Sequence, residues 1–440
     1  MAVERRRPED GETIAMLPGV GPVRSGRIAH GGGFWLVTYA FAVTMAFSSA
    51  PAPLYLLYQQ RDGFGPFTVT LVFAAYAIGV VASLFLAGHI SDWVGRRRIL
   101  LPAILINMLA GAIFLIPGVP ALLVARFISG ISIGMLTATA TAHLTELHLT
   151  ARPGESRVRA DLVATAANLG GIGMGPLIAG ILAEYAPRPL SLPYLVFEVL
   201  LLLGMVAVAL VPETVERRTT RPSYRPQRVT VPTEARPRYF SAAAVGLTAF
   251  AVFGLFTSLA PGFLAGTLHQ RSHALAGLVA FLVFASGAVA QILIVRIPLA
   301  RQLLLGMGTL AVGLALLTLG VWTASMALFL VGGMLCGAGA GAAFKGTITT
   351  VLGLAPPEAR GEALAGLFLA AYIGLAVPVL GLGLATQFLS TRIALLGFAA
   401  VLLAMLIVGS RQLLRPPTSS TPRPRAILPE QHCQDDVFAA

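Results

Sequence analysis

Twelve long apolar runs constrain this chain more than any other feature of its sequence. They lie at residues 34–58, 67–90, 99–116, 121–147, 162–185, 192–211, 239–263, 275–295, 303–321, 326–354, 363–388 and 393–408. Roughly 20 apolar residues suffice to cross the hydrocarbon core of a bilayer as an α-helix. In lipid the backbone polar groups must be satisfied within the segment, which favours helices. The sequence therefore predicts an all-α integral membrane protein with twelve transmembrane helices.

The composition agrees with a membrane protein. Hydrophobic residues make up 56% of the chain and charged residues only 11%, whereas a soluble domain carries about 25% charged residues. The net charge of +12 does not indicate a nucleic-acid partner, because the arginines lie in short loops between apolar runs and not along one helix face.

The positions of the basic residues predict the orientation in the membrane. The loops on one face carry only Arg61, Arg188, Arg271 and Arg392, and Lys345 and Arg126 lie within apolar runs. All the other basic residues lie in the tails and in the loops on the opposite face. Because basic loops stay on the cytoplasmic side, we expect both termini in the cytoplasm of a multi-pass plasma-membrane protein.

The chain divides into two similar halves. GISIGMLTATATAHLTEL, from Gly130, resembles GAGAGAAFKGTITTVLGL, from Gly337, and Pro176 corresponds to Pro378. Helical transporters are commonly built from such repeats. We therefore expect two six-helix pseudo-repeats, at residues 33–211 and 239–411. A cytoplasmic N-terminal tail at 1–32, an arginine- and proline-rich cytoplasmic linker at 212–238 and a cytoplasmic C-terminal tail at 412–440 would complete the chain.

The hairpin between the second and third runs reads GHISDWVGRRRIL. Its spacing of Gly88, Asp92, Gly95, Arg96 and Arg97 resembles the signature that the major facilitator superfamily carries at this place. The resemblance covers about residues 33–411 and implies the fold of that superfamily. It also implies that Asp92 lies near the start of the eleventh helix, around residues 360–363, where it would close the cytoplasmic side in the outward-facing state.

A second match to the superfamily is ARFISG in the fourth run. Arg126 would lie about 9 Å inside the outer surface, six residues into the helix. A buried guanidinium needs a partner, and Glu198 in the sixth run lies at a similar depth. We expect Arg126 and Glu198 to form an ion pair, which either holds the helices together or takes part in proton coupling.

The fifth run carries GGIGMGPLIAG. Gly171, Gly175, Pro176 and Gly180 resemble the glycine–proline signature of the superfamily's drug:proton antiporters, although Ala179 stands where a glycine is usual. Small residues at this spacing allow close helix packing, and this also occurs in transporters that are not antiporters.

Further polar residues lie inside the runs. Lys345 is the only lysine of the chain and lies in the tenth run. Its amine could bind an anionic group, take part in proton coupling by titrating when desolvated, or extend to the inner interface. His143 and Glu146, one turn apart near the inner end of the fourth run, could join a proton relay or lie at the interface.

Two other features suggest where a binding site lies. Pro51 and Pro53 are expected to break the first helix, and broken helices often line transporter sites. Nine aromatic residues are candidates for a cavity lining: Tyr39, Phe47, Tyr55, Tyr76, Phe253, Phe256, Phe344, Phe368 and Tyr372.

The sequence predicts a secondary active transporter that works by alternating access. Our first hypothesis is proton-coupled efflux of small organic or drug-like compounds by a monomer. The first helix lacks the acidic residue that several proton-coupled antiporters carry there. The alternative is a proton-coupled importer of an anionic metabolite that Lys345 recognises. A membrane-embedded enzyme is a distant third, because no catalytic group, metal cluster or cofactor site is recognisable in the helices.

Overall fold

The computed structural model describes residues 28–87, 90–215, 233–356 and 359–414, and the ordered elements in these ranges are all helical. Twelve helical segments of the described residues are long and apolar enough to cross a membrane. The predicted all-α fold with twelve spans is confirmed, and the ends of the spans differ from the expected ones by a few residues.

The first half contains α1 (His30–Ser49), η1 (Ala52–Leu54), α2 (Tyr55–Asp62), α3 (Pro66–Ala87), α4 (Ser91–Val94), α5 (Arg96–Phe114), α6 (Val119–Ala151), α7 (Val158–Thr165), η2 (Ala166–Gly170), α8 (Gly171–Tyr185) and α9 (Leu192–Leu210). The second half contains η3 (Thr233–Ala235), α10 (Arg236–Ser258), α11 (Ala260–Gly266), α12 (His273–Leu293), η4 (Ile294–Arg296), α13 (Leu299–Trp322), α14 (Met326–Leu354), α15 (Arg360–Phe388) and α16 (Thr391–Leu413).

The first helix breaks where the prolines predict. α1 ends at Ser49, the 3-10 turn η1 follows, and α2 continues to Asp62. Proline has no backbone N–H to donate, so Pro51 and Pro53 interrupt the helical bonding. The equivalent helix of the second half shows a similar break: α10 ends at Ser258, and α11 begins at Ala260.

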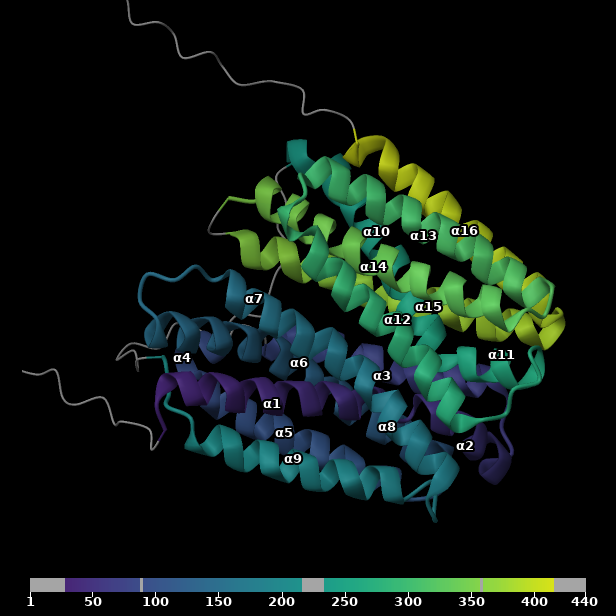
Figure 1. Cartoon of the computed structure of the whole chain (residues 1–440), viewed down its shortest axis with the longest axis horizontal. Coiled ribbons are helices and arrows are strands. Elements are labelled where there is room, and N and C mark those ends of the chain that lie inside the picture. Colours follow the sequence, from purple (N-terminus) through teal and green to yellow (C-terminus); the bar gives the residue numbers. More distant parts are fainter. Residues whose placement is uncertain (1–27, 88–89, 216–232, 357–358, 415–440) are drawn as a thin grey trace, which may run out of the picture.

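The two halves form two helical layers that meet along two helix pairs (Figure 1). Helix α8 packs on α12, and α3 packs on α15. We call the end where α9 ends and α10 begins the linker end, and the opposite end, where α2 and α11 lie, the far end (Figure 1).

Close helix packing within a half depends on small residues. A Cβ atom on Gly79 of α3 would collide with the carbonyl oxygen of Phe127 in α6, and one on Gly130 would collide with that of Tyr76. Only glycine allows these backbones to approach so closely. The outward faces are apolar, with exposed side chains such as Ile78 and Val199, as contact with lipid requires.

Candidate functional site

A cavity of about 390 Å³ lies between the two halves. Helices α1, α3, α6 and α7 of the first half and α10, α12, α14 and α15 of the second contribute to its lining. Arg157 and Asp161, at the start of α7, and Leu352, near the end of α14, place part of the lining toward the linker end. The cavity has the size of a small-molecule site.

A π-helical turn contributes to the first-half wall. η2 joins α7 to α8, and its Asn168 and Leu169 line the cavity. Such turns are rare and frequently occur at functional sites.

Aromatic side chains dominate the apolar lining. They are Phe73, Tyr76, Phe250, Phe253, Phe284, Phe344, Phe368 and Tyr372. The rings form contacts with one another: Phe253 stacks on Phe284 with centroids 4.7 Å apart, and Phe250 lies 4.7 Å from Phe344.

The sequence identified only part of this aromatic lining. Of the nine candidates, Tyr76, Phe253, Phe344, Phe368 and Tyr372 line the cavity. Tyr39, Phe47, Tyr55 and Phe256 do not. Phe73, Phe250 and Phe284 were missed, because nothing local in a uniformly apolar helix shows which face meets the other half.

Four charged side chains line the cavity: Arg126, Arg157, Asp161 and Lys345. Asp161 accepts a hydrogen bond from Arg157 at 3.3 Å. Lys345 is partly buried on α14, and no acidic partner for its amine occurs among the described residues.

Arg126 is almost fully buried, at 1% exposure, and makes three hydrogen bonds to neutral acceptors. Its Nη1 donates to the carbonyl oxygen of Ser48 at 2.5 Å, and its Nε and Nη2 donate to the hydroxyl of Tyr55 at 2.9 and 2.6 Å. The guanidinium also lies over the rings of Tyr55, Tyr76 and Phe114. Arg126 thus ties α6 to both sides of the break in the first span.

The expected ion pair between Arg126 and Glu198 does not form, because the guanidinium bonds to Tyr55 and Ser48 instead. The Glu198 side chain packs against Gly111 of α5. Its Oε1 is buried and has no hydrogen-bond partner among the described residues. The aromatic rings near Arg126 supply cation–π contact, and Tyr55 adds a hydroxyl acceptor, so neutral groups hold the guanidinium in this structure.

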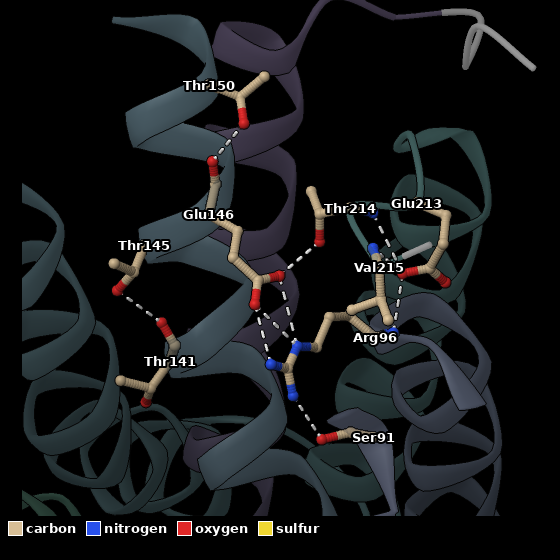
Figure 2. Close-up of polar contacts among 9 residues, drawn as sticks. All are labelled: Ser91, Arg96, Thr141, Thr145, Glu146, Thr150, Glu213, Thr214 and Val215. Atoms are coloured by element: carbon tan, nitrogen blue, oxygen red, sulfur yellow. Dashed lines mark hydrogen bonds and ion pairs between the residues drawn. The ribbon is translucent and has the colours of Figure 1, made fainter. Parts of the chain in front are cut away.

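Glu146 lies in a polar cluster at the linker end (Figure 2). Its carboxylate accepts hydrogen bonds from Nη2 of Arg96 at 2.8 Å and from the hydroxyl of Thr214 at 2.5 Å. Arg96 also donates to the hydroxyl of Ser91 at 2.7 Å. His143 is fully buried, and its Nε2 lies 3.3 Å from the carbonyl oxygen of Pro212. Glu146 therefore bonds across helices with the hairpin arginine, and no hydrogen bond joins it to His143 in the described part of the chain.

Glu213, which follows α9, holds the hairpin in place, a role that the sequence did not single out. Its carboxylate accepts hydrogen bonds from the backbone N–H groups of Arg96 at 2.8 Å and Arg97 at 3.1 Å, the first residues of α5. It thus caps a helix whose own N-cap residue, Gly95, has no side chain. The sequence VPET at the end of the sixth span was the available signal.

Gly95 has a backbone conformation that other residues avoid, with φ +114°. A Cβ atom there would lie 2.6 Å from Oε2 of Glu213. Gly88 and the side chain of Asp92 lie outside the described residues, so the expected contact of Asp92 with α15 stays a prediction.

The glycine–proline motif of α8 faces two neighbours. A Cβ atom on Gly171 would lie 2.6 Å from the carbonyl oxygen of Ala42 in α1, and Gly175 also packs on α1, at Ala46. Pro176 and Gly180 instead pack on α12 of the other half, where Gly180 contacts the backbone of His273. The motif therefore lies in the contact between the two halves.

His273 connects the halves at the far end. Its backbone N–H donates to Oε2 of Glu184 in α8 at 2.7 Å. Its Nδ1 lies 3.2 Å from the carbonyl oxygen of Pro53 in η1. Thr70 and Gly383 pack against each other where α3 and α15 cross. We call Glu184, His273 and Pro53 the far-end latch.

The described residues contain no group of three or more His, Cys, Asp or Glu side chains that could hold a metal ion.

A family model described as Major Facilitator Superfamily matches residues 34–323. The human organic anion transporter MFSD10 (TETRAN) is similar in structure, with a TM-score of 0.66 and 16% identity over 86% of this chain and 99% of that chain. A mutant of the nucleoside transporter NupG has a TM-score of 0.66 and 12% identity, again over 86% of this chain and 99% of the other. No curated protein matches in sequence. At these identities the structural neighbours show the fold alone.

Proposed function

This chain belongs to the Major Facilitator Superfamily, and we propose that it exports small organic compounds across the plasma membrane in exchange for protons. It is a multi-pass membrane transporter of the secondary type and not an enzyme. The observation that carries the proposal is the aromatic cavity between the two halves. An apolar, ring-lined wall favours an amphipathic organic compound over a sugar, which needs many buried hydrogen-bonding groups.

Alternating access fits the way in which the halves meet. The far-end latch and the α3–α15 contact join the halves at one end, while part of the cavity lining lies toward the linker end. The distribution of arginines supports a cytoplasmic linker end. In that orientation the cavity of this conformation would receive its cargo from the cytoplasm, as an exporter requires.

The α8 motif supports the antiporter type. Gly171 and Gly175 contact α1, whereas Pro176 and Gly180 contact α12. A helix that packs backbone to backbone against both halves can guide their relative motion. Both walls of the cavity come from one chain, and we propose that the monomer is the functional unit.

Glu198 is the residue that we propose to carry the proton. Its Oε1 is buried without a hydrogen-bond partner in the described structure, and an ionised carboxylate is costly in such surroundings. Glu146 is already engaged with Arg96 and Thr214, and His143 with the Pro212 carbonyl, so both are better suited to holding the linker end together.

The second candidate function is proton-coupled import of an anionic metabolite. Its supporting observation is Lys345, whose side chain lines the cavity. Import and export differ in the direction of the coupled proton movement.

The test uses the purified full chain in liposomes that contain a pH-sensitive dye. An imposed pH gradient should drive a fluorescent aromatic compound in the direction opposite to the protons, and a protonophore should abolish that movement. Movement of compound and protons in the same direction would favour the importer. Absence of any gradient-driven movement across a panel of organic anions, cations and neutral compounds would contradict both coupled functions.

A further inference from the structure

We propose that the cargo of this cavity is an aromatic organic anion, with one carboxylate or sulfonate group attached to a planar ring system. This inference rests on the proposed transport function, since it names the substrate class of the same cavity. It depends on three observations: the charges on the cavity wall, the position of Lys345 on the cavity face of α14 and the arrangement of the rings.

The charged side chains of the cavity do not balance. Asp161 is the one acidic residue among the described lining residues, and it is already paired with Arg157 at 3.3 Å. The hydrogen-bond acceptors of Arg126 are a hydroxyl and a backbone carbonyl, which carry no net charge. Lys345 has no acidic partner in the described ranges. Two positive charges on the wall therefore lack a counter-charge.

Lys345 belongs to the cavity face of α14. Lys345, Ile348 and Leu352 follow one another at spacings of three and four residues, and all three line the cavity. Residues at this spacing share one face of a helix. Lys345 thus lines the cavity, which favours a role in binding over extension along lipid to the membrane interface.

Aromatic rings line the same cavity as Lys345. Phe344 precedes Lys345 directly, and its ring lies 4.7 Å from Phe250 and 5.8 Å from Phe368. On the neighbouring wall Phe253 stacks on Phe284. Aromatic walls bind planar rings through stacked and edge-to-face contacts.

The rings by themselves would also attract organic cations, because the face of an aromatic ring carries negative charge. The sign of the cargo is therefore decided by Lys345 and Arg126. A cationic ligand would add a third uncompensated positive charge to a site of low polarity. An anion would supply the missing counter-charge and a charge-assisted hydrogen-bond acceptor.

The test measures binding to the purified full chain with four matched probes. Naphthoate carries an aromatic ring system and a negative charge, and acetate carries the negative charge without the rings. Naphthalenemethanol carries the rings without a charge, and naphthylmethylammonium carries the rings with a positive charge. Thermal stabilisation at increasing probe concentration gives the relative affinities, because a ligand of the native state raises the apparent stability. We expect naphthoate to bind at least tenfold more tightly than each of the other three.

Substitutions of Lys345 test whether the preference for naphthoate arises in the cavity. Lys345→Gln should weaken naphthoate binding at least tenfold and leave naphthalenemethanol binding unchanged, whereas Lys345→Arg should retain naphthoate binding. Arg392→Gln, which removes an arginine that does not line the cavity, is the matched control. Equal binding of naphthoate and naphthalenemethanol, tighter binding of the cation, or an unchanged naphthoate affinity in Lys345→Gln would each overturn the inference.

Counterflow of labelled naphthoate in liposomes separates this inference from the proposed function. Binding of naphthoate without movement across the membrane would support the cargo site and contradict transport. Movement of the neutral or cationic probe but not of naphthoate would support transport and contradict the anionic cargo. Binding of none of the probes would overturn the anionic cargo.

Discussion

The backbone N–H of His273 donates a hydrogen bond of 2.7 Å to the Glu184 carboxylate, and this bond joins the two halves of the molecule. His273 is the first residue of α12, so the carboxylate lies at the positive end of a helix that belongs to the other half. The bond can exist only while α8 and α12 are together. It is therefore a contact of the conformation in which the far end is closed.

Removing the latch carboxylate should favour opening of the far end. A cysteine at Thr257, a buried cavity residue near the far end of α10, reports on this opening. In Glu184→Ala we expect a membrane-impermeant maleimide, added at the far-end face, to label Thr257→Cys on the order of tenfold faster, since a hydrogen bond to a charged group is lost.

The background for that experiment replaces Cys433 with serine and keeps Cys336, which is fully buried. Glu155→Ala is the control, because Glu155 pairs with Arg152 within the first half. Equal labelling rates in Glu184→Ala and Glu155→Ala would show that the latch does not hold the far end closed.

The contribution of the Glu213 cap to stability can be measured by comparing two glycines with positive φ. Gly95 and Gly154 both have conformations that alanine resists, with φ +114° and +92°. A Cβ atom on Gly95 would collide with the Glu213 carboxylate, whereas one on Gly154 would meet no atom within 4 Å. We expect Gly95→Ala to cost at least about 1 kcal/mol more in stability than Gly154→Ala, because it adds a displaced helix cap to the backbone strain. Thermal denaturation in detergent measures both, and equal losses would mean that the cap contributes little.

Arg126 should stabilise the folded protein in addition to placing a positive charge on the cavity wall. Arg126→Ala leaves the Tyr55 hydroxyl and the Ser48 carbonyl without their donor, and we expect a loss of about 2–4 kcal/mol. Arg126→Lys should lose less, because an ammonium can keep one of the bonds. Arg61→Ala, which removes a more exposed arginine paired with Asp62, should cost no more than about 1 kcal/mol. Denaturation of the three variants side by side tests this order, and an Arg126→Ala protein as stable as Arg61→Ala would contradict it.

The role of Glu198 is testable by separating coupling from cargo movement. Glu198→Gln keeps the size of the side chain and removes its ability to ionise. We expect it to abolish transport driven by a pH gradient while leaving cargo exchange at equal pH within about twofold of the unaltered protein. Glu146→Gln should instead impair both activities, because it removes the negative charge that pairs with Arg96. Gradient-driven transport by Glu198→Gln would exclude Glu198 as the proton carrier.

The sequence alone determined the elements of this protein, because these depend on local properties. The length of an apolar run decides whether it spans a membrane, so the twelve spans were predicted within a few residues of their ends. Pro51 and Pro53 lack the backbone donors that a helix needs, so the sequence also predicted the break in the first span. The hairpin motif identified the superfamily, and the repeats the two halves, for the same reason: both are patterns along the chain.

Only the tertiary structure decided which side chains meet. Arg126 bonds to Tyr55 and Ser48 and not to Glu198, although a common depth in the membrane made that pair plausible. Depth is set by position along a helix, whereas partners are set by the rotation of each helix about its axis and by its neighbours. A helix that is apolar on every side carries no stripe to mark its buried face. For that reason Phe250, Phe284 and the capping role of Glu213 became evident only once the helices were packed.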